Sequence, residues 1–189
     1  METKILDIVA KRWSPVAFSD KPVNEKILES LFEAARWAPS AFNEQPWRFI
    51  YARREKDTAF KKMLDTLVPG NHEWAQHAPV LALSLARVFF TYNGKPNPTA
   101  YYDTGMAVGN LLAQATYMGL FVHQMSGFSA ENAREALRIP DEYEPIAMMA
   151  IGYYGNAKTL SGTLREREKK PRTRKPIEAL IFRGGFPAG

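Results

Sequence analysis

Two nearly continuous apolar runs constrain the fold of this chain more than any other feature of the sequence. They cover residues 79–86 and 145–153. A strand with one solvent-exposed face alternates apolar and polar residues, whereas a strand that is buried on both faces reads as a run of this kind. We therefore predict a buried strand in each of the two segments.

Segments with helical spacing separate these runs. Asn24 and Ser129 are typical N-caps, and Gly119 is a natural end for the longest helix. This order of elements lacks the strict alternation of a doubly wound sheet. We expect helices over residues 3–11, 24–37, 56–68, 99–118 and 129–137, and strands over residues 47–52, 79–86, 120–124 and 145–153.

The composition bounds the class of protein. The chain has 189 residues, of which 46% are hydrophobic, and we interpret residues 1–189 as a single globular domain. It has no cysteine, and its three histidines form no metal-binding motif, so we predict neither a disulfide nor a metal site. Because no signal peptide or membrane-spanning run is evident, we expect a soluble, cytoplasmic protein with no membrane partner.

The net charge of +5 comes largely from residues 165–175, which include seven lysines and arginines. A segment of this kind is compatible with a nucleic-acid-binding arm, a solvated tail or a cradle for one phosphate. No helix-turn-helix pattern or aromatic RNA-binding surface accompanies it, so we expect no nucleic-acid partner. Arg172 and Arg174 are at alternate positions and would point the same way in an extended chain.

Residues 39–47, between the second expected helix and the first expected strand, are rich in polar groups for a connection. Two prolines bracket Ser40, Asn43 and Gln45. On local grounds, the segment is either an ordinary polar turn or a loop that hydrogen-bonds a flat ligand with polar edges.

The motifs of common catalytic sites are missing from the sequence. It has no nucleophile elbow, no Walker loop and no glycine-rich dinucleotide motif after a strand, and this scarcity favours a cofactor as the carrier of the chemistry. Arg12 and Ser14 suit a phosphate, although in isolation a surface arginine beside a helix-ending serine is the simpler interpretation. Gly127, which follows Met125 and Ser126, would allow the backbone to approach a ligand closely.

Taken in order along the chain, these clusters resemble the family of nitroreductases that depend on flavin mononucleotide (FMN). The resemblance implies an α+β fold, a three-layer α-β-α sandwich with a mostly antiparallel central sheet. It also implies a homodimer with the flavin at the interface, and a C-terminal arm, about residues 156–189, that packs on the partner subunit. The segments that carry the resemblance are Arg12-Trp13-Ser14, residues 33–47, Asp103-Thr104-Gly105 with Asn110-Leu111-Leu112, Gly119-Leu120 with Ser126-Gly127-Phe128, and Arg172-x-Arg174-x-Pro176.

The resemblance further implies a set of cofactor-binding residues. The arginines and Ser14 would hold the phosphate and ribityl end of FMN. The polar groups of residues 39–45 would reach the flavin from the partner subunit, and the backbone of residues 125–127 would lie against the isoalloxazine ring. The full set is Arg12, Trp13, Ser14, Pro39, Ser40, Asn43, Gln45, Met125, Ser126, Gly127, Arg172 and Arg174.

The activity implied by the family is that of an oxidoreductase. A hydride would pass from NADH or NADPH through FMN to a small electron-poor acceptor, such as a nitroaromatic or a quinone, by a ping-pong mechanism. No side-chain acid or base is obligatory in such a reaction, so we name no catalytic residue. The acceptor and the choice of nicotinamide nucleotide stay open. The alternative is a protein that binds or sequesters flavin with little turnover.

Two residues depart from the family pattern and make this alternative conceivable. Val16 stands where many relatives have a basic residue, so one phosphate or flavin contact is either absent or made by Lys11 or Lys21 instead. Ser126 stands where some relatives have a glutamate that bears on nicotinamide binding. Two further residues near the expected flavin contacts, whose role the sequence leaves open, are Asn71 and Trp74.

Overall fold

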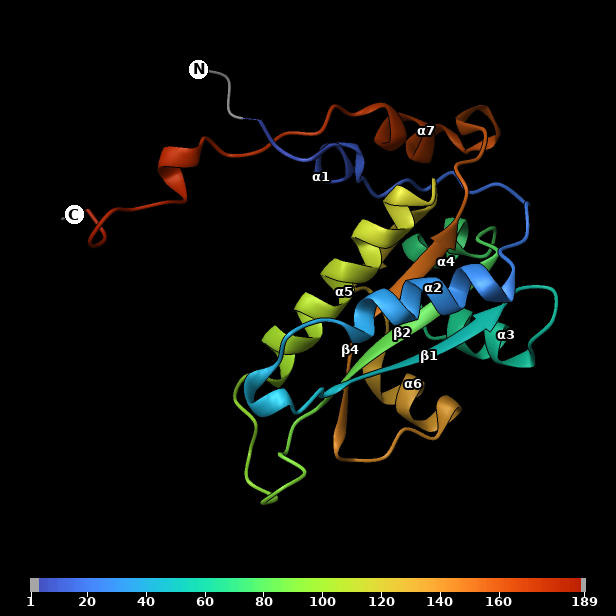
Figure 1. The fold of residues 1–189 in the computed structure, drawn as a ribbon. Helices are drawn as coiled ribbons and strands as arrows, with labels where there is room; N and C mark the ends of the chain where they lie inside the picture. Colours follow the sequence, from blue (N-terminus) through green and yellow to red (C-terminus); the bar gives the residue numbers. More distant parts are fainter. Residues whose placement is uncertain (1–3, 188–189) are drawn as a thin grey trace.

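The computed structural model describes residues 4–187 and has a four-stranded sheet at its centre (Figure 1). The spatial order is β1-β2-β4-β3, and every neighbouring pair of strands is antiparallel. This arrangement confirms the antiparallel sheet that the resemblance implied. The strands are β1 (Trp47–Arg53), β2 (Val80–Arg87), β3 (Phe121–Met125) and β4 (Tyr143–Gly152).

The two central strands are buried on both faces. Leu83 and Met148 belong to a core on one face of the sheet, whereas Ala82 and Met149 belong to a second core on the other face. Successive side chains of a strand point to opposite faces, so a strand between two cores must be apolar at nearly every position. The prediction of two buried strands is confirmed.

Helices cover both faces of the sheet and complete the three-layer α-β-α sandwich (Figure 1). Within residues 4–187, none of the helices is long and apolar enough to cross a membrane. The helices on one face are α2 (Glu25–Arg36) and α5 (Ala100–Tyr117), and those on the other face are α3 (Thr58–Leu64), α4 (Pro69–Ala75) and α6 (Ala130–Leu137).

The predicted helix ends agree with the structure where a cap marks them. Asn24 accepts a hydrogen bond from the Ile27 N–H at 2.9 Å, and Ser129 accepts one from the Asn132 N–H at 3.1 Å. Gly119 has a φ of +75°, the left-handed conformation that commonly follows the end of a helix.

The segment after β1 differs from the expectation of one helix over residues 56–68. The structure has two short helices there, α3 and α4, and Pro69 begins the second. A proline is favoured in the first turn of a helix, because the N–H that it lacks has no partner there in any case. The expected helix therefore ends earlier, at Leu64, and Pro69 marks the start of another.

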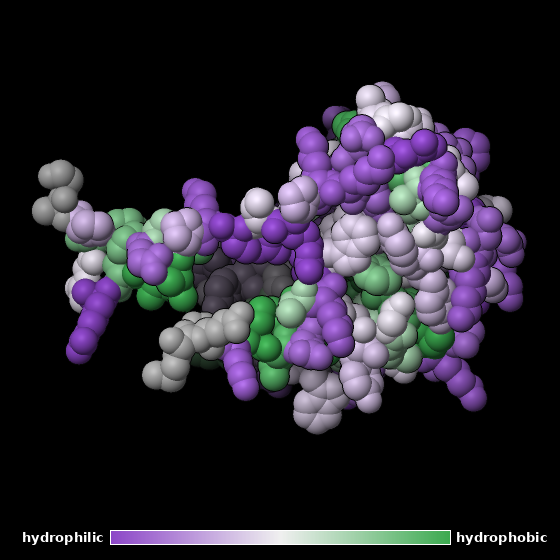
Figure 2. Space-filling view, turned by 90° about the horizontal axis from the view of Figure 1, so that it is seen from above, coloured by the Kyte–Doolittle hydropathy of each residue, from purple (hydrophilic) through white to green (hydrophobic). Residues whose placement is uncertain are grey.

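The segment that follows α1 lies beside the segment that follows α7 (Figure 1). A short helix, α1 (Asp7–Lys11), begins the described chain, and α7 (Gly162–Lys169) lies within the segment expected to be a polar tail. A single buried residue, Leu164, packs α7 on the core. Residues 171–187 are exposed throughout and project from the body of the molecule, with apolar side chains gathered at the far end (Figure 2). A 3-10 turn, η2 (Ala157–Thr159), precedes α7, and another, η3 (Ile177–Ala179), lies within residues 171–187.

Candidate functional site

Arg12 and Ser14 are held at one end of the sheet by the residue between them. The Trp13 ring packs against Phe121, at the start of β3, and against Tyr154, just beyond β4, with ring centroids 5.9 and 5.3 Å apart. This aromatic anchor places both polar neighbours on the same surface. Arg12 Nη1 donates a hydrogen bond to Ser14 Oγ at 3.2 Å, so the hydroxyl helps to orient the guanidinium.

Arg172 and Arg174 converge on the same place from the C-terminal end of the chain. Arg172 Nη1 donates a hydrogen bond to the Arg12 carbonyl oxygen at 2.7 Å. The three arginines line a cavity of about 230 Å³, together with residues of α7. Burial lowers the pKa of Arg12, and the positive charges of Arg174 and Arg172 lower it further. We call this group of Arg12, Arg172 and Arg174 the arginine cluster.

The arginine cluster has no carboxylate counter-ion in the described chain. Across residues 4–187, no Asp or Glu oxygen lies within 4.0 Å of any of its three guanidinium groups. Like charges that converge without a counter-ion favour the binding of an anion, and guanidinium groups match the geometry of a phosphate. This surface is therefore suited to a phosphate group.

Val16 lines this cavity as a buried apolar residue, and the cavity contains neither of the two lysines considered as substitutes for a basic residue. Lys11 pairs with Asp7 at 3.1 Å on the outer side of α1. The Lys21 ammonium lies 4.1 Å from the centre of the Tyr153 ring. The positive charge of the cavity comes instead from Arg12, from Arg167 of α7, and from Lys170, Arg172 and Arg174 after that helix.

The loop formed by residues 39–46 has a strained backbone. Phe42, Asn43 and Gln45 have φ values of +53°, +55° and +50°, in the left-handed region that residues other than glycine seldom adopt. The phenylalanine is the most unusual of the three, because a bulky side chain is disfavoured in this conformation. Strain of this kind persists only where the surroundings hold it, and it is concentrated at functional sites.

Two carboxylates hold the strained loop in place. Asp103, buried in the first turn of α5, accepts hydrogen bonds from the Ala41 N–H at 3.1 Å and from the Thr99 hydroxyl at 3.0 Å. Glu44 accepts one from the Thr91 N–H at 2.7 Å. Ser40 is also engaged, since its Oγ accepts from the Gln45 N–H at 3.0 Å. Asn43 is exposed at the surface, whereas Gln45 is half-buried and its Nε2 donates a hydrogen bond to the Asn43 carbonyl oxygen at 3.2 Å.

Gly127, beyond the end of β3, is in close contact with α4. Its carbonyl oxygen accepts hydrogen bonds from the Val68 N–H at 3.0 Å and from Asn71 Nδ2 at 3.1 Å. A Cβ at position 127 would lie 2.6 Å from the Asn71 amide nitrogen, so only glycine fits without a shift. Asn71 thus fixes the segment that follows Met125. Ser126 is exposed at this corner.

Trp74 is a core residue, which answers the question that the sequence left open. It is fully buried and packs against Phe18 and His123, with ring centroids 6.1 and 4.5 Å apart. His123 Nδ1 donates to the Pro15 carbonyl oxygen at 2.7 Å, and its Nε2 lies 3.3 Å from Arg167 Nη2. One neutral tautomer satisfies both contacts, with the proton on Nδ1 and an acceptor at Nε2.

The structure brings some of the predicted site residues together and keeps others apart. Arg12, Trp13 and Ser14 meet the two C-terminal arginines at the end of the sheet where β4 finishes. The loop of residues 39–46 precedes β1 at the opposite end, since Trp47 pairs with Ala86. The intervening β4 has 10 residues, which at about 3.3 Å each span roughly 30 Å. One chain therefore has two half-sites at opposite ends of its sheet (Figure 1).

Comparisons with known proteins show the family of this chain. The model of the Nitroreductase family matches residues 9–68 and 54–153. An uncharacterised 15.4 kDa protein of Mycolicibacterium smegmatis is 33% identical over 147 residues, which is 72% of this chain and 95% of that protein. The chain belongs to the nitroreductase family.

Solved structures of this family and fold are also similar. An oxidoreductase that contains FMN is 34% identical, with a TM-score of 0.93 over 100% of this chain and 96% of the other. A Desulfovibrio desulfuricans protein solved in complex with FMN shares the fold, with a TM-score of 0.75, 22% identity and coverage of 99% and 100%. A nitroreductase family protein from Clostridium difficile 630 has the same TM-score, 0.75, at 23% identity, with coverage of 97% and 100%.

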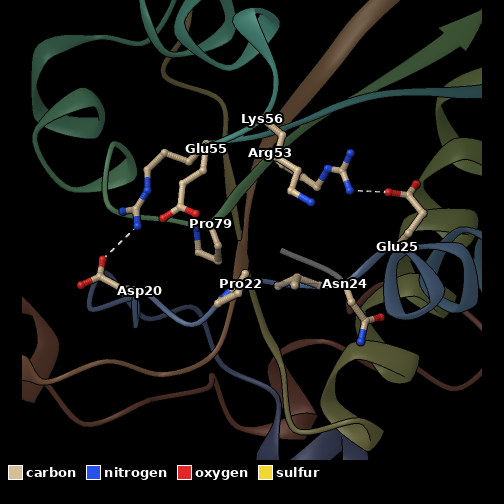
Figure 3. A pocket seen from close by; sticks show the side chains of 10 residues that line it. Asp20, Pro22, Asn24, Glu25, Arg53, Glu55, Lys56 and Pro79 are labelled. Atoms are coloured by element: carbon tan, nitrogen blue, oxygen red, sulfur yellow. Dashed lines mark hydrogen bonds and ion pairs between the residues drawn. The ribbon is translucent and has the colours of Figure 1, made fainter.

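A larger cavity, of about 380 Å³, lies between the loop before α2 and the turn after β1 (Figure 3). Its arginines already have partners. Arg54 pairs with Asp20 at 3.0 Å, and Arg53 pairs with Glu25 at 2.7 Å. Paired charges offer much less to an anion than the arginine cluster does, so the smaller cavity is the better candidate for a phosphate.

Sequence reasoning assigned no supporting role to the residues that hold the two half-sites. Asp103 and Glu44 hold the strained loop, and His123 and Glu168 hold the segment after Arg12. An acidic residue in the first turn of the longest expected helix was a usable signal for Asp103. The other three bind backbone groups that are distant in sequence, and such contacts leave no local pattern.

The buried histidine generates a prediction about pH. Burial, the largest effect, lowers the pKa of His123 to about 4, and the Arg167 and Arg12 charges add to this effect. Between pH 6.5 and 4 the unfolded chain then binds a proton that the folded chain does not, so stability falls as the pH falls through this window. We expect a loss of about 2 kcal/mol in the unfolding free energy between pH 7 and 4.5 from this residue.

Denaturant unfolding of wild type and His123→Asn at the two pH values measures the effect. The variant cannot titrate, so it should lose less stability than wild type over the same range. His77→Asn, at an exposed histidine, is the control and should follow wild type. An equal loss of unfolding free energy in wild type and in His123→Asn between the two pH values would contradict the prediction.

Proposed function

We propose that this chain is an FMN-dependent oxidoreductase. The observation that carries the proposal is the arginine cluster, three guanidinium groups without a carboxylate counter-ion in the described residues, at the end of a nitroreductase-family sheet. The pKa of Arg12 is lowered first by burial and then by the Arg174 and Arg172 charges, and a phosphate dianion bound there would offset the repulsion among the three cations. The FMN in the oxidoreductase with 34% identity supports the choice of this phosphate-bearing cofactor.

The residues on this surface fit the phosphate and ribityl end of FMN. Arg12, Arg172 and Arg174 would bind the phosphate, and the Ser14 hydroxyl, oriented by Arg12, would face the ribityl chain. When bound, FMN would accept a hydride from NADH or NADPH and deliver it to an electron-poor acceptor in a ping-pong cycle. The part of the protein is to bind and orient the reactants, and it needs no side-chain acid or base for this.

We further propose that two chains build each flavin site. The two half-sites of one chain lie roughly 30 Å apart along β4, too far to hold one FMN together. In a homodimer, the loop of residues 39–46 would reach the ring of the flavin whose phosphate is held by the partner. Exposed apolar residues are available for a dimer interface, among them Ile5, Leu6 and Val9 near α1, Tyr101 and Tyr102 on α5, and Ile177, Leu180 and Ile181 on the arm.

Residues of the strained loop and of the segment that follows β3 would contact the isoalloxazine ring. Asn43 and Gln45 present amide groups that match the polar edge of an isoalloxazine, and the strained backbone holds them at a fixed angle. The segment Met125 to Gly127 offers a backbone that Asn71 has already fixed. Groups held in advance bind with less entropic cost than mobile ones, and this favours retention of the cofactor.

The test of the activity is flavin reduction. The protein is purified, loaded with FMN and mixed anaerobically with NADH or NADPH, and absorbance near the flavin band is followed. We expect bleaching with at least one nucleotide and recovery on addition of a quinone or nitroaromatic. A protein that retains FMN but stays oxidised with both nucleotides would instead be a flavin-sequestering protein, and the oxidoreductase proposal would fail.

The arginine cluster can be tested by binding. Changing Arg172 and Arg174 together to Ala should weaken FMN binding on the order of 100-fold, because a hydrogen bond to a charged group contributes about 1.5–3 kcal/mol. Quenching of FMN fluorescence by the apoprotein measures the affinity. The control changes Lys169 and Arg183 to Ala, which removes the same charge outside the cavity. Equal losses in both variants would mean that only net charge matters.

The two-chain site can be tested by mixing subunits. One chain has Arg172→Ala with Arg174→Ala. The other has Asn43→Gly with Gln45→Gly, since glycine removes the amides and tolerates the positive φ. Each homodimer should bind FMN weakly at both sites. A mixed dimer, isolated with two different tags, should have one tight site, because one of its two sites receives intact residues from both chains. A mixed dimer without a tight site would contradict the shared site.

A further inference from the structure

Glu168, in the last turn of α7, is the residue of this structure whose position is hardest to reconcile with a phosphate site. Its side chain lines the same cavity as the arginine cluster. A carboxylate there repels a phosphate. It is also unfavourable at the C-terminal end of a helix, where the helix dipole favours positive charge. We therefore expect the contacts of Glu168 to compensate for this unfavourable position.

Those contacts are with the backbone that follows Ser14. Glu168 Oε2 accepts a hydrogen bond from the Val16 N–H at 2.9 Å, and Oε1 accepts one from the Ala17 N–H at 3.4 Å. Val16 and Ala17 are both buried, so without Glu168 their N–H groups would lose these hydrogen-bond partners at a cost in free energy. The Tyr154 hydroxyl is adjacent as well, and its pKa is raised by burial and then by the Glu168 charge. The carboxylate is thus held by donors and is unavailable to the arginines.

The neighbouring residue of α7 makes a second contact with the same segment. Arg167 Nη2 lies 3.3 Å from His123 Nε2, and His123 Nδ1 donates to the Pro15 carbonyl oxygen at 2.7 Å. The backbone groups of residues 15–17 are therefore tied to α7 directly through Glu168 and indirectly through β3. Of the α7 side chains, Leu164 alone is buried, so these polar contacts make up much of the attachment of the helix.

The attachment matters for the arginines that follow. The backbone becomes extended at Lys170, and residues 171–187 are exposed throughout. Arg172 comes four residues after Glu168 and reaches back to the carbonyl oxygen of Arg12. With little of the arm packed on its own chain, the position of Arg172 and Arg174 relative to Arg12 is set by where α7 ends.

We propose that Glu168 is a positioning residue for the cofactor phosphate. By holding the Val16 and Ala17 amides, it fixes the end of α7 so that the arm's two arginines face Arg12. The inference rests on the proposed FMN site. The predicted change in affinity is opposite to the one expected from charge repulsion alone, because removal of a negative charge from an anion-binding cavity should weaken anion binding.

The experiment compares FMN with riboflavin, which lacks the phosphate, as ligands of the full-length apoprotein. Glu168→Ala should weaken FMN binding on the order of 10-fold and leave riboflavin affinity unchanged. Glu168→Gln keeps one acceptor oxygen and should lie between wild type and Glu168→Ala. Glu166→Ala is the matched control, since Glu166 lies on the same helix, carries the same charge and pairs only with exposed Lys169. It should bind FMN as tightly as wild type, or slightly more tightly.

A double-mutant cycle separates positioning from general damage. In a background with Arg172→Ala and Arg174→Ala, Glu168→Ala should cause almost no further loss of FMN affinity, because the groups that it positions are gone. Tighter FMN binding in Glu168→Ala, an equal loss for riboflavin, or additive losses in the cycle would each overturn the proposal. If Glu168→Ala does not fold, Glu168→Gln enters the same cycle. Failure of wild type to bind either flavin would instead reject the FMN site itself.

Discussion

The pairing of β2 with β4 is the interaction on which the rest of the structure depends. These strands form the centre of the sheet, and their side chains fill a separate core on each face. Helices cover both faces of these two strands, which leaves little of their surface open to a polar ligand. The polar side chains that could bind a ligand are therefore found at the two ends of the sheet, where the strands lead into loops. The arginine cluster lies at one end and the amide loop at the other.

This separation distinguishes the candidate site from a pocket enclosed by one chain. Each end has only part of the groups that a flavin site would need. One end has cations for a phosphate, and the other has amides for the isoalloxazine ring. Both sets are held firmly by carboxylates that bind backbone N–H groups, Glu168 at the first end, and Asp103 and Glu44 at the second. The chain thus has two separate surfaces, and the complement that we propose for each is a second copy of the chain.

Much of the fold could be predicted from the sequence because its signals were strong and local. The two apolar runs gave the central strands, and the side chains of Asn24 and Ser129 gave helix starts. The α7 helix was missed because Leu164 is its single buried anchor, and one apolar residue has no periodicity. The left-handed Phe42 opposes its own propensity, so no sequence rule predicts it. Glu168 was missed for a different reason, since its partners are backbone groups 151 and 152 positions away.

The α5 helix spans the molecule between the two half-sites. Its first turn holds the strained loop through Asp103, and its last turn leads through Gly119 into β3, against which Trp13 packs. One added residue would turn everything beyond it by about 100° and move it by about 1.5 Å. Loops elsewhere in the chain can change length with little effect on the relation between the two ends. In α5, by contrast, the number of residues sets the distance and the rotation between the two ends. An insertion or deletion there would therefore disturb the site more than most substitutions.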